Sequence, residues 1–428
     1  MLTSLYTAIT GMNANGTWLS VIGDNIANLN TVGFKSSRVA FGDVLAGVVG
    51  SLQVGRGVLI SDISPLFTQG SFETTASALD LSIDGDSFFI LSDSGARDYT
   101  RAGQFSIDKD GYIVNPGGLI LQGYLADAAG NITGTLGDLQ IGGRQSLANA
   151  TTSATIAINL DATSAIQTTP FTLDSNGDGN DDDPANYNFS NTIAVFDSQG
   201  GVHRATLYFE KTADNTWDVH YVYPDPLNPS VLTEAGSQTL TFDTNGALVD
   251  DGSGTAISFD FGASVTSPQN ITFNYGTGTG ESPAGTGLDG TTQYAADFGV
   301  MLLSQDGYPA GSLTNVSISE DGIITGVFTN GQTRSIGQIA LAKFTAPDAL
   351  AKLGRNLYSE SFDSGQPIIG MANTSGLGRV LSNSLELSNV DLAEEFVKMI
   401  SAQRGFQANS RIITTTDELL QELVNLKR

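Results

Sequence analysis

The chain has 428 residues, a formal net charge of −26 at pH 7 and no cysteine. The length allows about two to four domains, and the lack of cysteine excludes disulfides, thiolate nucleophiles and cysteine metal sites. The acidity argues against nucleic acid and anionic membranes as partners, and no run of about 18 apolar residues predicts membrane insertion.

The first thirty residues, 1–30, predict an amphipathic helix. Its apolar side chains alternate at spacings of three and four residues, which places them on one helical face. These side chains are Leu2, Leu5, Ile9, Met12, Leu19 and Ile26. Gly16 and Gly23 fall where the same register calls for bulk, so they either weaken the stripe or allow another backbone to approach closely.

An asparagine-rich segment follows this helix. Asparagine side chains bond to nearby backbone, and a glycine can adopt the positive φ that ends a helix, so the pattern predicts a cap and an exit turn. The residues concerned are Asn25, Asn28, Asn30, Thr31, Gly33, Phe34 and Lys35. Residues 31–72 then lose helical periodicity, and we expect an extended or irregular connector there, matched by residues 360–387 near the other end.

The body of the chain predicts β structure, in keeping with its 50 glycines. Apolar and polar residues alternate from Leu79 to Asp84, and Asn330-Gly331 is a hairpin turn signal. We expect a first β domain made of residues 73–150 and 294–359. An outer domain, residues 151–293, is inserted into it.

Charge distinguishes the insert from the rest of the chain. Residues 151–293 contain 18 Asp and Glu against Arg204 and Lys211, a net charge of −16 out of −26. Such a shift marks a separate domain. Alternation predicts a hairpin around residues 203–223, with His220 turned toward solvent.

One loop of the insert has the spacing of a calcium-binding loop, with a glycine at position six. Its positions one, three, five and nine are Asp174, Asn176, Asp178 and Asp182. Position twelve is Ala185, so the bidentate carboxylate is missing unless Asp181 or Asp183 substitutes for it. A solvated acidic loop is the simpler interpretation, and we expect no other cofactor.

Two Asp-Ser-Gly triplets, at Asp93 and Asp363, raise the possibility of an enzyme. Pepsin-like proteases use two aspartates that share a proton to activate water. However, Ser92 interrupts the apolar run expected before the first triplet, and Asp-Ser-Gly is also a common turn. We find no other catalytic motif and expect no enzymatic activity; a secreted aspartic-protease-like enzyme is the remote alternative.

The last 41 residues, 388–428, predict a second and longer amphipathic helix. It starts near Val390, after a capping-box spacing of Ser388 and Asp391. A strict repeat of seven implies supercoiling against another helix, for which the N-terminal helix is the candidate. We therefore expect a coiled-coil-like pair that assembles with other copies. The repeat and its extensions are Leu392, Phe396, Met399, Phe406, Ile413, Leu420 and Val424.

These two terminal segments carry a resemblance. The stretch from Asp24 to Lys35 resembles the N-terminal signature of the axial proteins of the bacterial flagellum, the rod and hook subunits. The C-terminal part resembles the same family independently, through Ser388, Asn389, Val390, Asp391, Gln403 and Arg404. The resemblance covers the whole chain outside residues 151–293, and the size of that insert is typical of hook rather than rod subunits.

The resemblance implies a mainly β, multi-domain fold with nested β domains and paired terminal helices. It implies a non-enzymatic hook subunit that self-assembles into the flexible tube transmitting motor torque to the filament. The implied partners are copies of itself, the distal rod protein, the hook cap protein, the hook–filament junction protein and the flagellar export apparatus, with export that uses no cleaved signal peptide. A distal rod or other hook-associated axial protein is the alternative.

Overall fold

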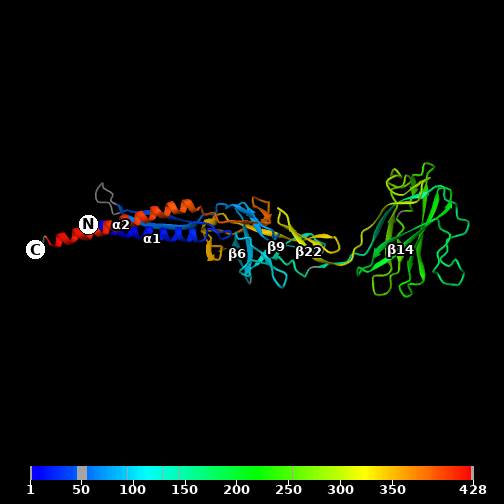
Figure 1. The fold of residues 1–428 in the computed structure, drawn as a ribbon, viewed down its shortest axis with the longest axis horizontal. Coiled ribbons are helices and arrows are strands. Elements are labelled where there is room, and N and C mark those ends of the chain that lie inside the picture. The colour runs from blue at the N-terminus through cyan, green and yellow to red at the C-terminus, as the bar shows by residue number, and fades with distance from the viewer. Residues whose placement is uncertain are drawn as a thin grey trace. The chain divides into compact units, whose positions relative to one another are not determined.

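The computed structural model describes residues 2–45, 55–93, 95–127, 129–143, 145–252 and 254–425. The chain forms two compact units, which we describe separately. Unit 1 comprises Met1–Arg144, Leu313–Val327 and Thr333–Arg428, and unit 2 comprises Gln145–Ser312 and Phe328–Gln332. Unit 2 is thus inserted into unit 1 along the chain, and in Figure 1 it takes the green part of the colour range.

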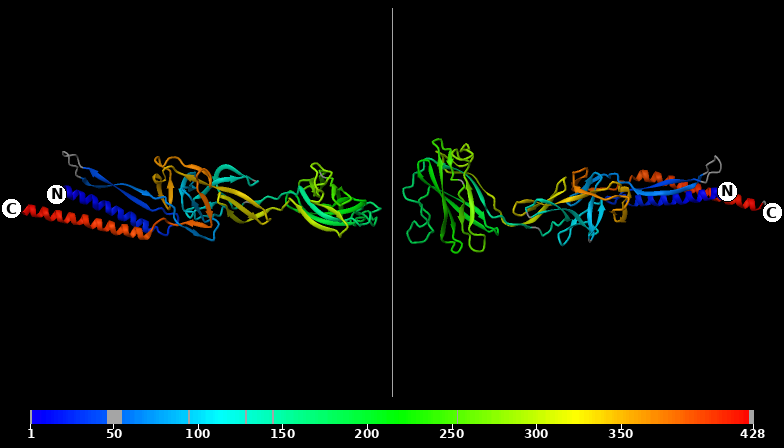
Figure 2. Two further views of the ribbon diagram at one scale, coloured as in Figure 1. Left: turned by 90° about the horizontal axis from the view of Figure 1, so that it is seen from above. Right: turned by 180° about the vertical axis from the view of Figure 1, so that it is seen from behind.

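Both ends of the chain are helical. Helix α1 spans Leu2–Ala27 and helix α2 spans Leu392–Asn425. At 34 residues, α2 is roughly 50 Å long. The two helices lie side by side in both views of Figure 2, with the N- and C-termini at the same end of the pair. Neither helix has the length and hydropathy that a membrane span requires.

The first turn of α2 corrects the predicted cap. The backbone N–H groups of Ala393 and Glu394 donate to the Asp391 carboxylate at 2.8 and 3.1 Å, so Asp391 is the N-cap. The Ser388 hydroxyl accepts only the neighbouring N–H of Val390, at 3.4 Å. The predicted start at Val390 is therefore two residues early, because a carboxylate at position 391 satisfies the free N–H groups better than the serine does.

The connector expected to be extended or irregular contains a long hairpin. Strands β1 (Ser37–Leu45) and β2 (Gly55–Pro65) pair antiparallel from Ser37 opposite Pro65 onward. The hairpin packs on α1, where Trp18 meets Phe41 edge-on at 5.8 Å between ring centroids. Sequence patterning missed these strands because their polar and apolar residues do not alternate cleanly.

The β part of unit 1 is built on one twisted sheet with strand order β22-β23-β24-β9-β5-β6-β26-β25. The predicted turn at Asn330-Gly331 joins β23 to β24. Two clusters of buried apolar side chains lie against the sheet, one including Leu91 and Ile339 and the other Phe88 and Tyr99. The strands that lie in or border unit 1 are β3 (Phe72–Thr74), β4 (Leu81–Asp84), β5 (Phe88–Asp93), β6 (Ala96–Thr100), β7 (Ser106–Ile107), β8 (Ile113–Val114), β9 (Ile120–Ala126), β10 (Ile132–Asp138), β22 (Gly311–Ile318), β23 (Ile323–Phe328), β24 (Thr333–Lys343), β25 (Ala351–Gly354), β26 (Leu357–Ser359), β27 (Ile368–Met371), β28 (Arg379–Ser382) and β29 (Ser384–Glu386), with a 3₁₀ turn at Pro347–Ala349.

Unit 2 contains two five-stranded sheets that share one apolar core. One sheet is the meander β13-β14-β15-β16-β17, and the other contains β18-β19-β12-β20 with β21 along β12. Because β12 pairs with β21, unit 2 extends past the predicted boundary at residue 293. The strands are β11 (Gln145–Ser146), β12 (Ser153–Asp161), β13 (Phe189–Phe196), β14 (Val202–Ala213), β15 (Thr216–Pro224), β16 (Leu232–Phe242), β17 (Leu248–Asp250), β18 (Ile257–Phe259), β19 (Gln269–Asn274), β20 (Thr292–Tyr294) and β21 (Gly299–Gln305).

The hairpin predicted around residues 203–223 is confirmed as β14 and β15, with Trp217 fully buried. The prediction that His220 faces solvent is wrong. Its ring donates to or accepts from Glu234 at 2.7 Å and Glu210 at 3.2 Å, and it stacks on Phe171 at 4.3 Å between centroids. The outer face of this hairpin is covered by the loop that carries Phe171, which no local pattern reveals.

The carboxylates around His220 predict a pH dependence for unit 2. Burial by itself lowers the pKa of His220, but the hydrogen bonds that its ring donates to the Glu234 and Glu210 carboxylates, together with their negative charge, outweigh burial and raise this pKa above its usual 6.5. A raised folded-state pKa means that the stabilisation is complete below 6.5 and is lost as pH rises through the folded-state value.

We therefore expect the free energy of unfolding of unit 2 to fall as pH rises above 6.5 and through the raised folded-state pKa of His220. The chain has two histidines, so NMR titration of their two Cε1–H signals in the full chain measures both pKa values, and His220→Gln assigns them. A His220 signal that titrates below 6.5 would contradict the expected raised pKa.

Candidate functional site: the helix pair and its junction with the β domain

The seam between α1 and α2 is made of small and polar residues. On α2 a seven-residue repeat of Glu395, Ala402, Asn409 and Thr416 faces inward, and three of these four residues are at most 5% exposed. On α1 the buried residues are Ala8, Gly11, Ala14, Ile22 and Asn25. Close packing of small side chains brings the two backbones near each other.

The apolar stripe predicted for α2 does not form this seam. Leu392, Phe396 and Phe406 are exposed, while Met399, Ile413 and Leu420 are half-buried. The prediction found a true repeat of seven, but a second repeat three residues away packs on α1 because its small residues allow closer approach. The assembly role of the apolar stripe stays a prediction.

The stripe predicted for α1 is likewise displaced from the centre of the seam. Leu5, Ile9, Met12, Leu19 and Ile26 are all half-buried. The buried residues Ala8, Gly11 and Asn25 each lie one position before a residue of the predicted stripe, at Ile9, Met12 and Ile26. The side chains of Leu2 and Val424, also predicted for this interface, lie outside the described residues.

Residues of the N-terminal motif connect the helix pair to the β1–β2 hairpin and the β domain. The side chain of Asn25 accepts the N–H of Ser37 at 2.8 Å, donates to its carbonyl at 3.0 Å and donates to Glu395 at 3.3 Å. Asn25 thereby joins α1, β1 and the start of α2. Gly33 has φ of 69°, and a Cβ there would lie 2.6 Å from the backbone nitrogen of Ala102, so this turn requires glycine.

The remaining motif residues divide between structural and exposed positions. Thr31 donates to Asn28 at 3.1 Å and Phe34 is buried, which stabilises the exit turn of α1. Val390 is buried before α2 begins. Asn30, Gln403 and Arg404 are exposed, so the structure gives no intrachain role to these three.

The C-terminal motif binds the same region, at the open end of the β1–β2 hairpin. Asn389 accepts the N–H of Ser36 at 2.8 Å. Its amide donates to the Leu66 carbonyl and to the Thr68 hydroxyl, each at 2.8 Å. Asn389 thus binds the residues just before β1 and just after β2, and it holds the open end of the hairpin against the segment that leads into α2.

A buried carboxylate that the sequence analysis missed lies at the centre of this junction. Glu386 contacts Lys35 at 2.6 Å and Arg101 at 3.6 Å, and all three side chains are at most 1% exposed. The same carboxylate accepts the N–H of Gly70 at 2.9 Å, and the Glu386 carbonyl accepts that of Gly33 at 2.7 Å. Four segments that are distant in sequence therefore meet at one residue.

Burial has a measurable electrostatic effect at this junction. It lowers the pKa of Lys35, with Glu386 opposing the change, and it also lowers the pKa of Arg101. Both cations are held by acceptors besides Glu386, since Lys35 donates to the Thr68 carbonyl at 2.8 Å and Arg101 to that of Gly85 at 2.7 Å. The pair of cations around one carboxylate compensates a charge that would otherwise be costly to bury.

A recess of about 700 Å³ opens beside the junction in unit 1. Its lining includes the motif residues Asn28 and Thr31, together with Asp98 and Lys352. Burial lowers the pKa of Lys352, which donates to Ser37 at 2.7 Å, and raises that of Asp98. Among the described residues that line this recess, no nucleophile is hydrogen-bonded to a base.

The predicted calcium loop is closed by its own backbone. Asp174 accepts the N–H groups of Gly177, Asp178 and Gly179 at 2.7 to 3.2 Å. Asp183, a possible substitute for the missing ligand, is held by Ser175 at 2.7 Å, and these bonds lower the pKa of Asp183. Calcium binding by Asp174, Asn176, Asp178 and Asp182 stays a prediction.

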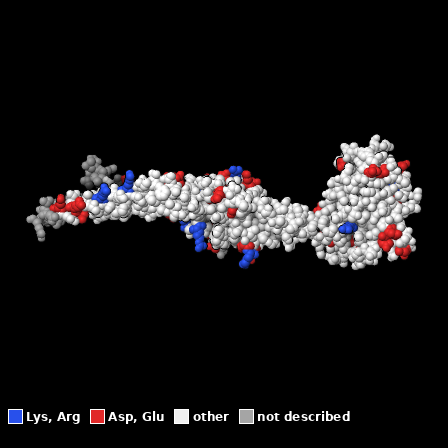
Figure 3. Space-filling model, viewed as in Figure 1, with Lys and Arg blue, Asp and Glu red and all other residues white. Residues whose placement is uncertain are grey.

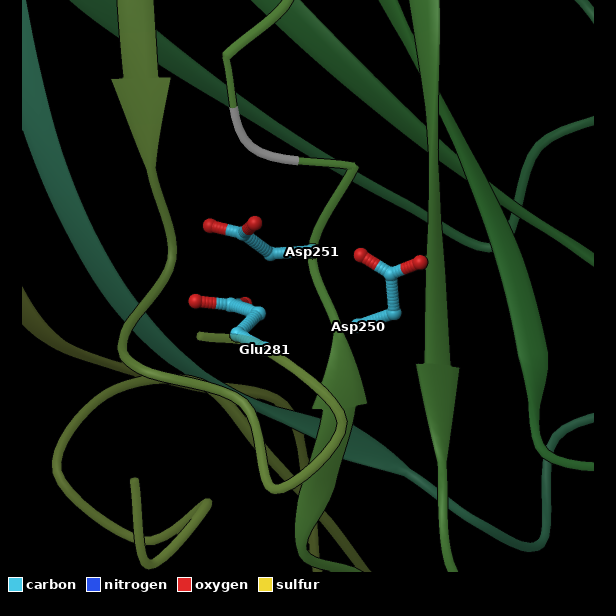
Figure 4. Close-up of side chains that lie close together, drawn as sticks. All are labelled: Asp250, Asp251 and Glu281. Atoms are coloured by element: carbon cyan, nitrogen blue, oxygen red, sulfur yellow. The ribbon is translucent and has the colours of Figure 1, made fainter. Parts of the chain in front are cut away.

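One group of carboxylates elsewhere in unit 2 lies closer together. In the part of the chain that the structure describes, Asp250, Asp251 and Glu281 are the one group of three or more acidic or histidine side chains whose ligand atoms all lie within 4.8 Å of one another (Figure 4). Asp251 is buried and accepts the N–H of Tyr275 at 3.2 Å. This bond gives the carboxylate a structural role, and we assign no ion to the group.

The two aspartates of the Asp-Ser-Gly triplets have no catalytic arrangement. Asp93 ends β5 and Asp363 lies in a loop, and both are exposed. Among the described residues no hydrogen bond joins them. A proteolytic dyad requires two carboxylates close enough to share a proton.

Four family models match parts of the chain, including segments near both ends, and agree with this architecture. They are "Flagella basal body rod protein" at residues 5–35, "Flagellar hook protein FlgE/F/G D1 domain" at 82–178, "Flagellar basal body protein FlaE D2 domain" at 159–308 and "Flagellar basal body rod FlgEFG protein C-terminal" at 381–426. Helix pair, first β domain and inserted domain together define an axial protein of the flagellar rod and hook type.

Full-length relatives narrow the assignment. The chain is 37% identical to the flagellar hook protein FlgE of Escherichia coli strain K12, over 98% of this chain and 99% of that protein. It is 36% identical to that of Borreliella burgdorferi, over the full length of both. The chain belongs to the flagellar hook protein family, and it is a structural subunit of the hook. A crystal structure of Helicobacter pylori hook protein FlgE2 aligns with 73% of this chain and 100% of that one, at 16% identity and a TM-score of 0.49.

The junction predicts that removing one buried charge destabilises unit 1 selectively. Glu386→Gln leaves Lys35 and Arg101 without their counter-charge, so we expect unfolding of unit 1 to become easier by about 3 kcal/mol. The matched control is Arg379→Gln, which breaks the exposed contacts with Asp84 and Glu320 and should cost at most about 1 kcal/mol. Calorimetry of the full chain checks both; equal effects of the two variants would contradict a central role for Glu386.

The calcium prediction has its own test. If the loop binds calcium, millimolar calcium should raise the unfolding temperature of unit 2 by mass action. Asp178→Ala removes the ligand at position five and should abolish that rise, whereas Asp225→Ala, outside the loop, should keep it. Magnesium at the same concentration controls for ionic strength, and an unchanged unfolding temperature of the unmodified chain would exclude the site.

Proposed function

We propose that the chain polymerises into the flexible tube of the hook through the outward face of its terminal helices, and that this tube transmits motor torque. The supporting observation is a set of large apolar side chains on α2 that α1 leaves uncovered. They are Leu392, Phe396, Val397, Ile400, Phe406, Ile412 and Leu419, exposed by 37 to 65%. They lie along most of α2 and on several of its sides, and an exposed apolar surface of this kind marks a site of protein contact.

A second copy of the same chain is the partner that best fits this exposed apolar surface of α2. Figure 3 shows both acidic and basic side chains at the helical end of the molecule. Asp24 on α1 and the five acidic and three basic residues of α2 sum to a net charge of −3, out of −26 for the chain, so copies can stack through the helices with little net repulsion. Repetition of one heterologous contact generates a helical assembly, as a tube requires.

The same proposal covers the export, the location and the partners of the subunit. The subunit is non-enzymatic, is exported by the flagellar export apparatus without a cleaved signal peptide, and stands in the hook outside the cell. Its end partners are the distal rod protein, the hook cap protein and the hook–filament junction protein. Support comes from the family membership.

A single charge on the outward face tests polymerisation. Phe406→Asp buries an unpaired carboxylate in each contact between copies, so we expect at least a tenfold loss of sedimentable polymer, from a cost of about 3 kcal/mol. Gln332→Asp introduces the same charge at an exposed position in the turn between β23 and β24, away from the helices, and should assemble normally. Electron microscopy of both purified chains provides the measurement, and normal tubes from Phe406→Asp would refute the interface.

A further inference from the structure

The seam between α1 and α2 contains one reciprocal contact. A Cβ added at Gly11 would lie 2.7 Å from the side-chain nitrogen of Asn409, and one added at Gly405 would lie 2.9 Å from the side-chain oxygen of Asn15. Each helix therefore places an asparagine over a glycine of the other. On both helices the asparagine follows its own glycine by four residues, which is one helical turn.

The register of this contact continues along the pair. Ten residues from Asn15 to Asn25 on α1 match ten residues back from Gly405 to Glu395 on α2, where Asn25 donates to Glu395 at 3.3 Å. Asn15 is held in place by a bond from its amide to the Gly11 carbonyl at 2.7 Å. The helices thus run antiparallel without a local shift between these contacts.

A seam of small residues needs such a device. Alanine and glycine allow close approach but fill little volume, so sliding one helix along the other changes the packing energy only slightly. Large apolar knobs or a polar residue at a seam position normally specify register. On α2 the four residues that face α1 are Glu395, Ala402, Asn409 and Thr416, and none of them is large and apolar.

Shifting α2 along α1 by one helical turn shows how the two glycines and two asparagines distinguish the observed register from its neighbours. A slip of four residues in one direction sets Asn15 against Asn409, where both side chains compete for the same space. The opposite slip sets Gly11 against Gly405 and leaves a gap with no side chain to fill it. Only the observed register gives each glycine an asparagine.

We propose that Gly11, Asn15, Gly405 and Asn409 form a register lock for the terminal helix pair. These four residues fix the position of α2 along the axis of α1. They thereby fix where the exposed apolar side chains of α2 lie for contact with the next copy. This inference rests on the proposed polymerisation and adds the residues that make it register-specific.

Exchange of the contact between helices tests the lock. Gly405→Asn sets two asparagines against each other, and Asn15→Gly removes one of them and leaves a gap; we expect each alone to lower the yield of tubes at least tenfold. The double variant Asn15→Gly/Gly405→Asn reverses one half of the contact and should restore the yield to within about threefold of the unmodified chain.

Helix propensity does not explain this pattern. Asparagine is a better helix former than glycine, so Gly405→Asn alone should help if only propensity mattered. The matched control is Gly23→Asn, the same change in α1. A Cβ added at Gly23 would have no atom within 4 Å outside its own stretch of helix, so this variant should assemble like the unmodified chain. A double variant no better than its worse parent would overturn the lock.

Cysteine pairing tests the lock separately from polymerisation, because the chain has no cysteine of its own. Gly11→Cys with Asn409→Cys should form a disulfide within one chain, since a Cβ at position 11 lies 3.1 Å from the Asn409 side-chain carbon Cγ. Gly16→Cys with Asn409→Cys should not, because Gly16 has no neighbour within 4 Å.

The outcomes of the two experiments are distinct. If the unmodified chain forms no tubes, the proposed function fails, and the disulfide in the soluble full chain still decides the lock. If tubes form but the two cysteine pairs cross-link equally well, or the first pair links different chains, the lock fails and polymerisation stands.

Discussion

The carboxylate of Glu386 is the constraint on which the arrangement of unit 1 depends. It lies fully buried between Lys35 and Arg101 and also accepts the backbone N–H of Gly70. Each partner comes from a different part of the chain: the exit from α1, the segment after the β1–β2 hairpin and the start of the β domain. A buried charge has few acceptable positions because every partner must be present to offset its desolvation.

This constraint fixes how the helix pair leaves the β domain. Glu386 ends β29 and α2 begins six residues later, while Asn389 between them bonds to residues at the open end of the hairpin. Asn25 meets Glu395 at the first turn of α2. The direction of both helices is therefore set at the junction, and the contacts of Gly11 with Asn409 and of Gly405 with Asn15 lie further along the seam.

The division of labour on α2 follows from side-chain size. Small residues face α1 and permit close packing, whereas Phe396, Val397 and Ile400 remain uncovered. A single chain therefore has a stable pair and an apolar surface at once. In a monomeric protein such a surface would promote aggregation, but in a structural subunit of a polymeric organelle it is the expected means of contact.

Sequence patterns were informative where a local rule was sufficient. Periodicity found both helices, turn residues found the β23–β24 and β14–β15 hairpins, and the charge step located an inserted domain. The terminal motifs indicated the family before any contact was known. They did so because their residues serve backbone geometry and buried bonds that few alternatives satisfy, as Gly33 and Asn389 illustrate.

Tertiary structure decided which face of each helix is inside and which buried charges meet. Two repeats of seven coexist on α2, and hydrophobicity favoured the one with Phe406, whereas the contact with α1 uses the one with Ala402 and Asn409. The choice depends on the distance between two backbones, which a single helix does not encode. Glu386 and His220 were missed for the same reason, because their partners are distant in sequence or lie on a covering loop. The sequence by itself determined the elements, their order and the family; only the folded chain determined which surfaces remain free for other copies, since exposure depends on what the rest of the molecule covers.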